Sequence, residues 1–192
     1  LLWGKHAPLP LLILSVALLA CGLAAQTRPA GPARLTGESS AQLFEGMGTH
    51  HRPVSTSSLL AQRYFDQGLV WTFAFNHDEA IRSFREAARL DPACAIAWWG
   101  VALCNGPHIN NPVMSPEQFR DAWDALQQAQ QRRAKASPAE QALIDALAHR
   151  YANPPPEDRR PLDEAYAAAM RRAWQAHSDD PDIGVLFAEA LM

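Results

Sequence analysis

Four of the seven histidines in this chain of 192 residues are placed where they could act as ligands of one metal ion: His50, His51, His77 and His108. Imidazole nitrogens suit Zn²⁺ and Cu²⁺, and Asp78 or Asn110 could add an oxygen ligand. No pair of these histidines has the i, i+4 spacing of a metal site on one helix. One hypothesis is therefore a Zn²⁺ or Cu²⁺ site. The alternative is that each histidine caps a helix, forms a local hydrogen bond or lies in solvent.

The chain lacks the sequence motifs of common catalytic sites. No Gly-rich phosphate loop, no G-x-S-x-G and no H-E-x-x-H occurs. The acidic residues fall at positions expected on helix faces and helix caps, rather than as a pair that flanks a cleft. We therefore predict that this part of the chain is not an enzyme, and that it needs no cofactor unless the histidines bind zinc or copper.

Signals that begin helices recur along the chain after residue 56. Ala, Leu, Arg, Glu and Gln are abundant there, and no run of alternating β-branched residues predicts a strand. Ser115-Pro116, Ser137-Pro138 and Asp180-Pro181 each place a capping side chain before a proline, which favours the first turn of a helix. Ser57 or Ser58 can cap the first helix. These patterns predict an all-α fold class.

Residues 61–94, AQRYFDQGLVWTFAFNHDEAIRSFREAARLDPAC, have the spacing of one tetratricopeptide repeat, which is a pair of antiparallel helices of about 34 residues. The agreement covers seven positions: Tyr64, Gly68, Trp71, Ala80, Phe84, Ala87 and Pro92. Gly68 and Ala80 are small where the two helices approach, and Pro92 ends the second helix. We predict a tetratricopeptide-type helical-hairpin solenoid over residues 57–192, with about three hairpins and the start of a fourth, truncated at its C-terminus.

The inner wall of such a solenoid is a candidate surface for a partner. The predicted wall residues come from the first helix of each hairpin: Phe65, Leu69, Thr72, Phe73, Trp99 and Leu103. They lack the Lys and Asn that some repeat proteins use to hold a C-terminal carboxylate. The wall would instead bind an apolar segment of another protein or peptide. The alternative is that residues 40–56, or a part of the protein beyond Met192, cover it, because large apolar patches are seldom exposed.

Three strings resemble a group of exported bacterial tetratricopeptide repeat proteins: HRPVSTSSLLAQRYFDQGL, AFNHDEAIRSF and PACAIAWWGVALCNGPHINNP. The resemblance covers most of residues 46–192. It implies an exported repeat protein with a His-containing segment before its first repeat, and it carries no established activity. In a stack of hairpins the turns lie on one edge, so we expect His77 and His108 to share that edge, with roughly 10 Å between their backbones.

Residues 1–25 have the order of a secretory signal peptide, with a charged start, an apolar stretch and small residues. The apolar stretch, Leu9 to Ala20, is shorter than the roughly 20 residues of a membrane span. The string LLACG resembles a lipobox that would make Cys21 a lipidation site, and cleavage after Leu23-Ala24-Ala25 is the alternative. Residues 26–56 are predicted to be a flexible tether and lead-in segment. The predicted location is the periplasm of a bacterium, or its membrane through a lipid anchor.

The charge and the other cysteines exclude further classes of function. The formal net charge is −3, and nucleic-acid binding needs clustered Lys and Arg. The one basic run, Arg132, Arg133 and Lys135, is interpreted as a solvated helix end. Cys94 and Cys104 are predicted near the two ends of one helix, roughly 15 Å apart. A disulfide needs Cα atoms within about 7 Å, so we expect two unpaired core thiols.

Overall fold

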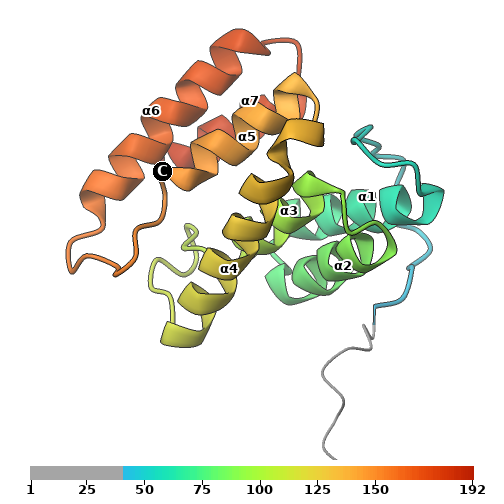
Figure 1. Cartoon of the computed structure of the whole chain (residues 1–192), viewed down its shortest axis with the longest axis horizontal. Helices are drawn as coiled ribbons and strands as arrows, with labels where there is room; N and C mark the ends of the chain where they lie inside the picture. The colour runs from blue at the N-terminus through green and yellow to red at the C-terminus, as the bar shows by residue number, and fades with distance from the viewer. Residues whose placement is uncertain (1–40) are drawn as a thin grey trace, which may run out of the picture. The chain divides into compact units, whose positions relative to one another are not determined.

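The computed structural model describes residues 41–192, which form seven α-helices and one short 3-10 turn at Arg133–Lys135 (Figure 1). The α-helices are α1 Leu59–Phe73, α2 His77–Leu90, α3 Ala95–Asn105, α4 Pro116–Arg132, α5 Pro138–Ala148, α6 Arg160–Ala176 and α7 Pro181–Ala190. No β-strand occurs in this part of the chain, so the predicted all-α class is confirmed for it. Within the same residues, no helix combines the length and the apolar character that a membrane span requires.

The predicted capping residues begin four of these helices. Ser58, Ser115, Ser137 and Asp180 precede α1, α4, α5 and α7, and each side chain accepts a hydrogen bond from a backbone N–H of the first turn. Helix α2 begins with Asn76 as its N-cap and His77 as its first residue, although His77 was expected at the edge formed by the turns. His77 is therefore fixed in a helix rather than placed in a turn.

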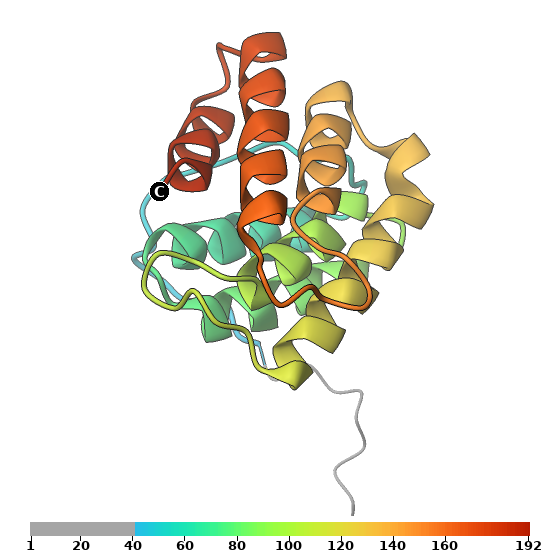
Figure 2. The same cartoon turned by 90° about the vertical axis from the view of Figure 1, so that its left-hand side faces the viewer.

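Consecutive helices pack against one another along the chain. Helix α2 contacts both α1 and α3, and α4 packs on α3. Helix α5 contacts α3 as well as α6, and α6 contacts α7. Figure 2 shows the last three helices, from orange to red, side by side. This arrangement is all-helical and repeat-like.

The packing of the first three helices is built around the ring of Phe84 in α2. This side chain is fully buried and lies between Gly68 of α1 and Gly100 of α3. A Cβ atom added at Gly68 would lie 2.7 Å from the ring, and one added at Gly100 would lie 2.6 Å from it. Carbon atoms do not approach so closely in folded proteins, so both positions require glycine while Phe84 keeps its place. The small residue predicted at Gly68 thus has a physical reason.

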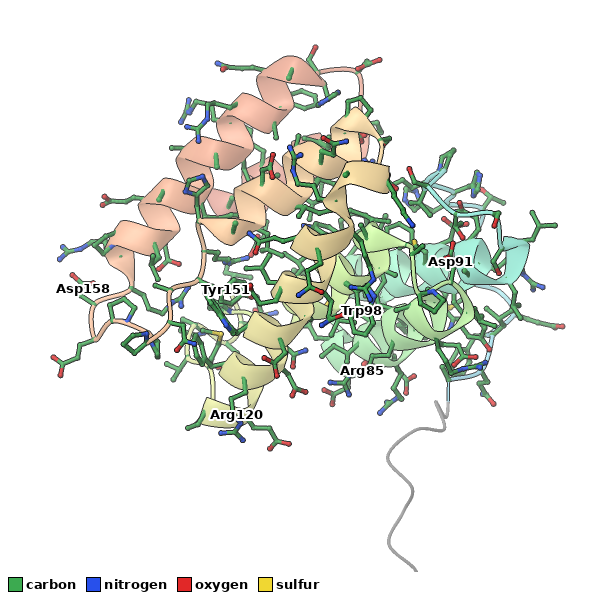
Figure 3. The ribbon with its side chains drawn as sticks, viewed as in Figure 1. Arg85, Asp91, Trp98, Arg120, Tyr151 and Asp158 are labelled. Atoms are coloured by element: carbon green, nitrogen blue, oxygen red, sulfur yellow. The ribbon has the colours of Figure 1, made fainter. Side chains whose placement is uncertain are left out.

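Tyr151, just after α5, connects the later helices to α3. Its ring is buried, and its hydroxyl donates a hydrogen bond to the carbonyl oxygen of Ala102 (2.6 Å). Gly106 leaves room for that hydroxyl, since a Cβ there would lie 2.3 Å from it. Figure 3 shows Tyr151 among the helices, whereas Arg120 and Asp158 lie at the margin of the described part.

The cysteine predictions have different outcomes. Cys94 and Cys104 are both buried and unpaired, as expected from their separation along one helix. The hydroxyl of Thr72 lies 3.2 Å from Cys104 Sγ. Cys21 lies outside the described residues, together with the predicted signal peptide and the first part of the predicted tether.

Residues 41–56, the described part of the predicted tether and lead-in segment, are hydrogen-bonded to three helices. Arg52 is buried, and its guanidinium donates to Asp180 Oδ1 (2.6 Å) and Asp182 Oδ2 (3.2 Å) at the start of α7. Its backbone N–H donates to Asp66 of α1 (3.1 Å), and Ser55 donates to the buried Glu140 of α5. Burial alone would raise the pKa of Asp180, but the hydrogen bond and the charge of Arg52, together with backbone N–H bonds from Ile183 and Asp182, lower it overall.

The substitution Gly100→Ala is expected to reduce the free energy of unfolding by about 1–3 kcal/mol, because its methyl group would overlap the Phe84 ring. Helix propensity acts in the opposite direction by about 1 kcal/mol and only partly offsets this loss. Urea unfolding followed by far-UV circular dichroism measures the change. In a Phe84→Leu background the methyl group has more room, so the same substitution should cost less. An equal cost in both backgrounds would contradict this packing.

The substitution Arg52→Ala is expected to reduce the free energy of unfolding by about 3 kcal/mol, because two largely buried carboxylates would lose the guanidinium and only Asp182 would keep a side-chain partner, His50. Arg85→Ala is the matched control. Its ion pair with Asp121 is exposed, and such pairs contribute little to stability. Similar losses in the two variants would show that Arg52 does not hold α7 in place.

Candidate functional site

The predicted inner wall divides into two groups of residues. Phe65, Leu69 and Trp99 are almost completely buried, so they offer no surface to a partner. The expectation of an open wall is corrected for these three, and the physical reason is helix packing. Phe65 packs on the Phe84 ring with 5.3 Å between ring centroids, and α5 packs on α3, which carries Trp99. The other three predicted residues, Thr72, Phe73 and Leu103, line a pocket.

The four predicted metal ligands also divide into two groups. The rings of His77 and His108 are in contact, with 4.1 Å between their centroids. His50 instead places Nε2 3.2 Å from Asp182 Oδ1, and Asp66 Oδ2 accepts a hydrogen bond from His51 Nδ1 (2.8 Å). Among residues 41–192, no group of three or more His, Cys, Asp or Glu side chains is arranged to hold a metal ion. The proposed cluster of four histidines is thus corrected to one pair, His77 and His108, which we call the His pair.

The His pair is held in its neutral form. Burial is the main cause that lowers the pKa of His77 to about 4; the neighbouring His108 adds to the shift and Asp78 opposes it. Burial also lowers the pKa of His108, with Glu189 opposing the shift and Arg150 adding to it. Both imidazoles are therefore uncharged at neutral pH. Neither ring forms a hydrogen bond with another described residue, and His108 Nδ1 is buried without a partner.

The His pair borders a pocket of about 470 Å³ between the C-terminal ends of α1 and α3 and one face of α7. We call it the apolar pocket, because most of its wall is apolar: Phe73, Phe75, Leu103, Val185, Leu186 and Met192. Its charged lining residues are Arg150 and Glu189, which face each other with 3.4 Å between nitrogen and oxygen. Its volume falls within the roughly 300–1,000 Å³ of typical ligand pockets. Residues 41–56 contribute nothing to its lining.

Phe75, at the rim of the apolar pocket, has a left-handed backbone with φ of 59°. It directly follows the cap residue of α1: its N–H donates to the Thr72 carbonyl (3.0 Å), and the Asn76 N–H donates to the Trp71 carbonyl (2.9 Å). This pair of bonds is the Schellman motif, where glycine is usual because other residues have an energetic cost of about 1–2 kcal/mol there. The ring is 52% exposed, so burial does not compensate for the strain. Strain kept at an exposed aromatic residue makes the apolar pocket a candidate functional site.

Two larger hollows are weaker candidates. One of about 550 Å³ is lined by His50, Arg52, Asp180 and Asp182, whose polar groups already contact one another. The other, of about 490 Å³, lies between loop residues 112–116 and 155–159. Neither contains a residue with a strained backbone, whereas the apolar pocket combines such a residue with two neutral histidines.

Sequence reasoning missed several residues of the apolar pocket. Arg150, Val185 and Glu189 lie far along the chain from α1, and no motif links them to it. Phe75 could have been found, because it stands directly before the Asn76 cap, where a helix usually ends in glycine.

Comparison with known proteins adds no relative. No protein-family model, no curated protein and no solved structure matches this chain. The candidate site therefore rests on the geometry of its own residues.

The neutral His pair predicts how stability changes with pH. An unfolded histidine has a pKa near 6.5, whereas the pKa of folded His77 is about 4. The unfolded chain binds more protons between these values, so the free energy of unfolding should fall as pH is lowered from about 6.5 towards 4. His77→Phe keeps a ring against His108 but removes the titrating group. Urea unfolding at about pH 7 and about pH 5 should show a smaller loss in the variant than in the wild type.

The other charged groups near the His pair, Asp78, Arg150 and Glu189, are the same in both proteins. The difference between the two pH profiles therefore reports His77 together with its electrostatic effect on His108. Identical profiles would mean that His77 is as easily protonated in the folded protein as in the unfolded one.

Proposed function

We propose that this chain is a tetratricopeptide-type scaffold that binds an apolar segment of another protein or peptide in the apolar pocket. The spacing of residues 61–94 and the successive packing of α1 to α4 support the scaffold. The order of residues 1–25 supports an exported protein, located in the periplasm of a bacterium or held at its membrane through Cys21. The net charge of −3 supports a protein partner rather than a nucleic acid.

The strained Phe75 is the observation that carries this proposal. A glycine at this position would end α1 without strain, yet the chain keeps a large ring that is half exposed. The ring would gain contacts when an apolar side chain of the partner enters the pocket. Val185 on α7, also 52% exposed, lies on the same pocket. These two side chains are exposed in the free protein, and their burial against a partner would contribute favourable binding free energy.

Phe75→Gly should have opposite effects on stability and on binding. Loss of the strain should raise the free energy of unfolding by about 1 kcal/mol. Loss of the ring should weaken binding of apolar peptides by at least about tenfold. The probes are short peptides selected on the wild-type protein from a displayed random library. Fluorescence anisotropy gives their Kd, and urea unfolding gives the stability. If Phe75 had a purely structural role, its replacement would not raise the free energy of unfolding and weaken peptide binding at the same time.

Matched variants locate the binding surface. Val185→Asp, in the apolar pocket, should also weaken the selected peptides. Val113→Asp should not, because this valine is 72% exposed but lies outside the apolar pocket. Wild-type affinity in all three variants would overturn the assignment. A dimer of the wild-type protein that dissociates in Phe75→Gly would assign the pocket to a second copy of this chain.

A further inference from the structure

The His pair is positioned by backbone that is fixed on both sides. His77 is the first residue of α2, where the side chain of Asn76 caps the helix. His108 and Asn111 exchange two backbone hydrogen bonds, of 3.0 and 2.9 Å, just after α3. The two rings are tilted by 45° and their centroids are 4.1 Å apart. The side chains can adjust by rotation, but their Cα atoms cannot easily separate.

The imidazole nitrogens of the His pair are available as metal ligands. A neutral imidazole has one nitrogen with an unshared electron pair, and this is the form that binds transition metals. No other described residue forms a hydrogen bond with a ring nitrogen of either histidine, and His108 Nδ1 is buried without a partner. Each ring can therefore present a nitrogen to a metal without first losing a hydrogen bond to the protein.

We propose that His77 and His108 together bind one divalent transition-metal ion at the rim of the apolar pocket, Cu²⁺ more tightly than Zn²⁺. The preference follows the general order of affinities for nitrogen ligands. Two protein ligands leave coordination positions open, for water or for a group that enters the pocket. The charges around the pair include Asp78 and Glu189 against one cation, Arg150, so they do not exclude a positive ion.

The site is weaker than a structural zinc site, because such a site has four protein ligands. It does not depend on the proposed partner, since the metal can be tested alone. It also differs from a site built on all four histidines, in which His50 and His51 would be ligands. Those two residues are paired with Asp182 and Asp66.

The experiment is a calorimetric titration of the tag-free, chelator-free protein with Cu²⁺ and, separately, with Zn²⁺ at neutral pH. We expect one ion per chain and tighter binding of Cu²⁺. His77→Phe and His108→Phe should each weaken binding by at least about tenfold, because each removes one of only two ligands. His149→Ala is the matched control, since this exposed histidine ends α5 outside the pocket and should have no effect.

Equal affinity in the wild type and His77→Phe would overturn the proposal. An equal loss in His149→Ala would do the same, because it would indicate unspecific binding to surface histidines. If a phenylalanine variant fails to fold, imidazole NMR resonances of the wild-type protein provide the test with Zn²⁺. Shifts confined to His77 and His108 support the site, and shifts that begin at His50 or His51 contradict it.

Discussion

The Phe84 ring between two glycines is the contact on which the arrangement of the first three helices depends. Because Gly68 and Gly100 have no side chain, α1 and α3 can both contact one ring of α2. That contact sets how the end of α1, the start of α2 and the end of α3 lie relative to one another. Phe75, His77 and His108 occupy these three places. A core contact without any polar group thus determines the position of three residues of the candidate site.

The candidate site contains several energetically unfavourable features that folding alone does not require. Phe75 has a strained backbone and an exposed ring, and two imidazoles are kept close together and uncharged. Helix α7 completes the pocket from far along the chain, and the lead-in segment holds that helix through Arg52. Such a combination is expected where binding, rather than stability, determines which residues are present. The protein-binding and metal-binding proposals use neighbouring but different groups of this site.

Local patterns predicted the parts of the fold that local physics controls. Ser115, Ser137 and Asp180 begin helices as expected, because a capping side chain acts on its own first turn. His77 and His108 were expected to lie near each other, and their rings are in contact. The prediction that Phe65, Leu69 and Trp99 lie on an exposed surface was wrong, because it assumed that the inner wall of the repeat is open to solvent, whereas other helices cover these residues. Arg150 and Glu189 could not be predicted, since α7 reaches the pocket only through tertiary packing.

Binding of apolar groups in the apolar pocket can be measured by methyl NMR with a small aromatic probe. Benzyl alcohol would be added to protein with labelled Leu, Val and Met methyl groups. If the probe binds in the apolar pocket, the methyl resonances of Leu103, Val185, Leu186 and Met192 should show saturable shifts. Those of core residues such as Leu126 and Leu143 should stay unchanged. Shifts confined to Val113 and Met114, in the hollow between the two loops, would contradict binding in the apolar pocket, and so would no saturable shift at all.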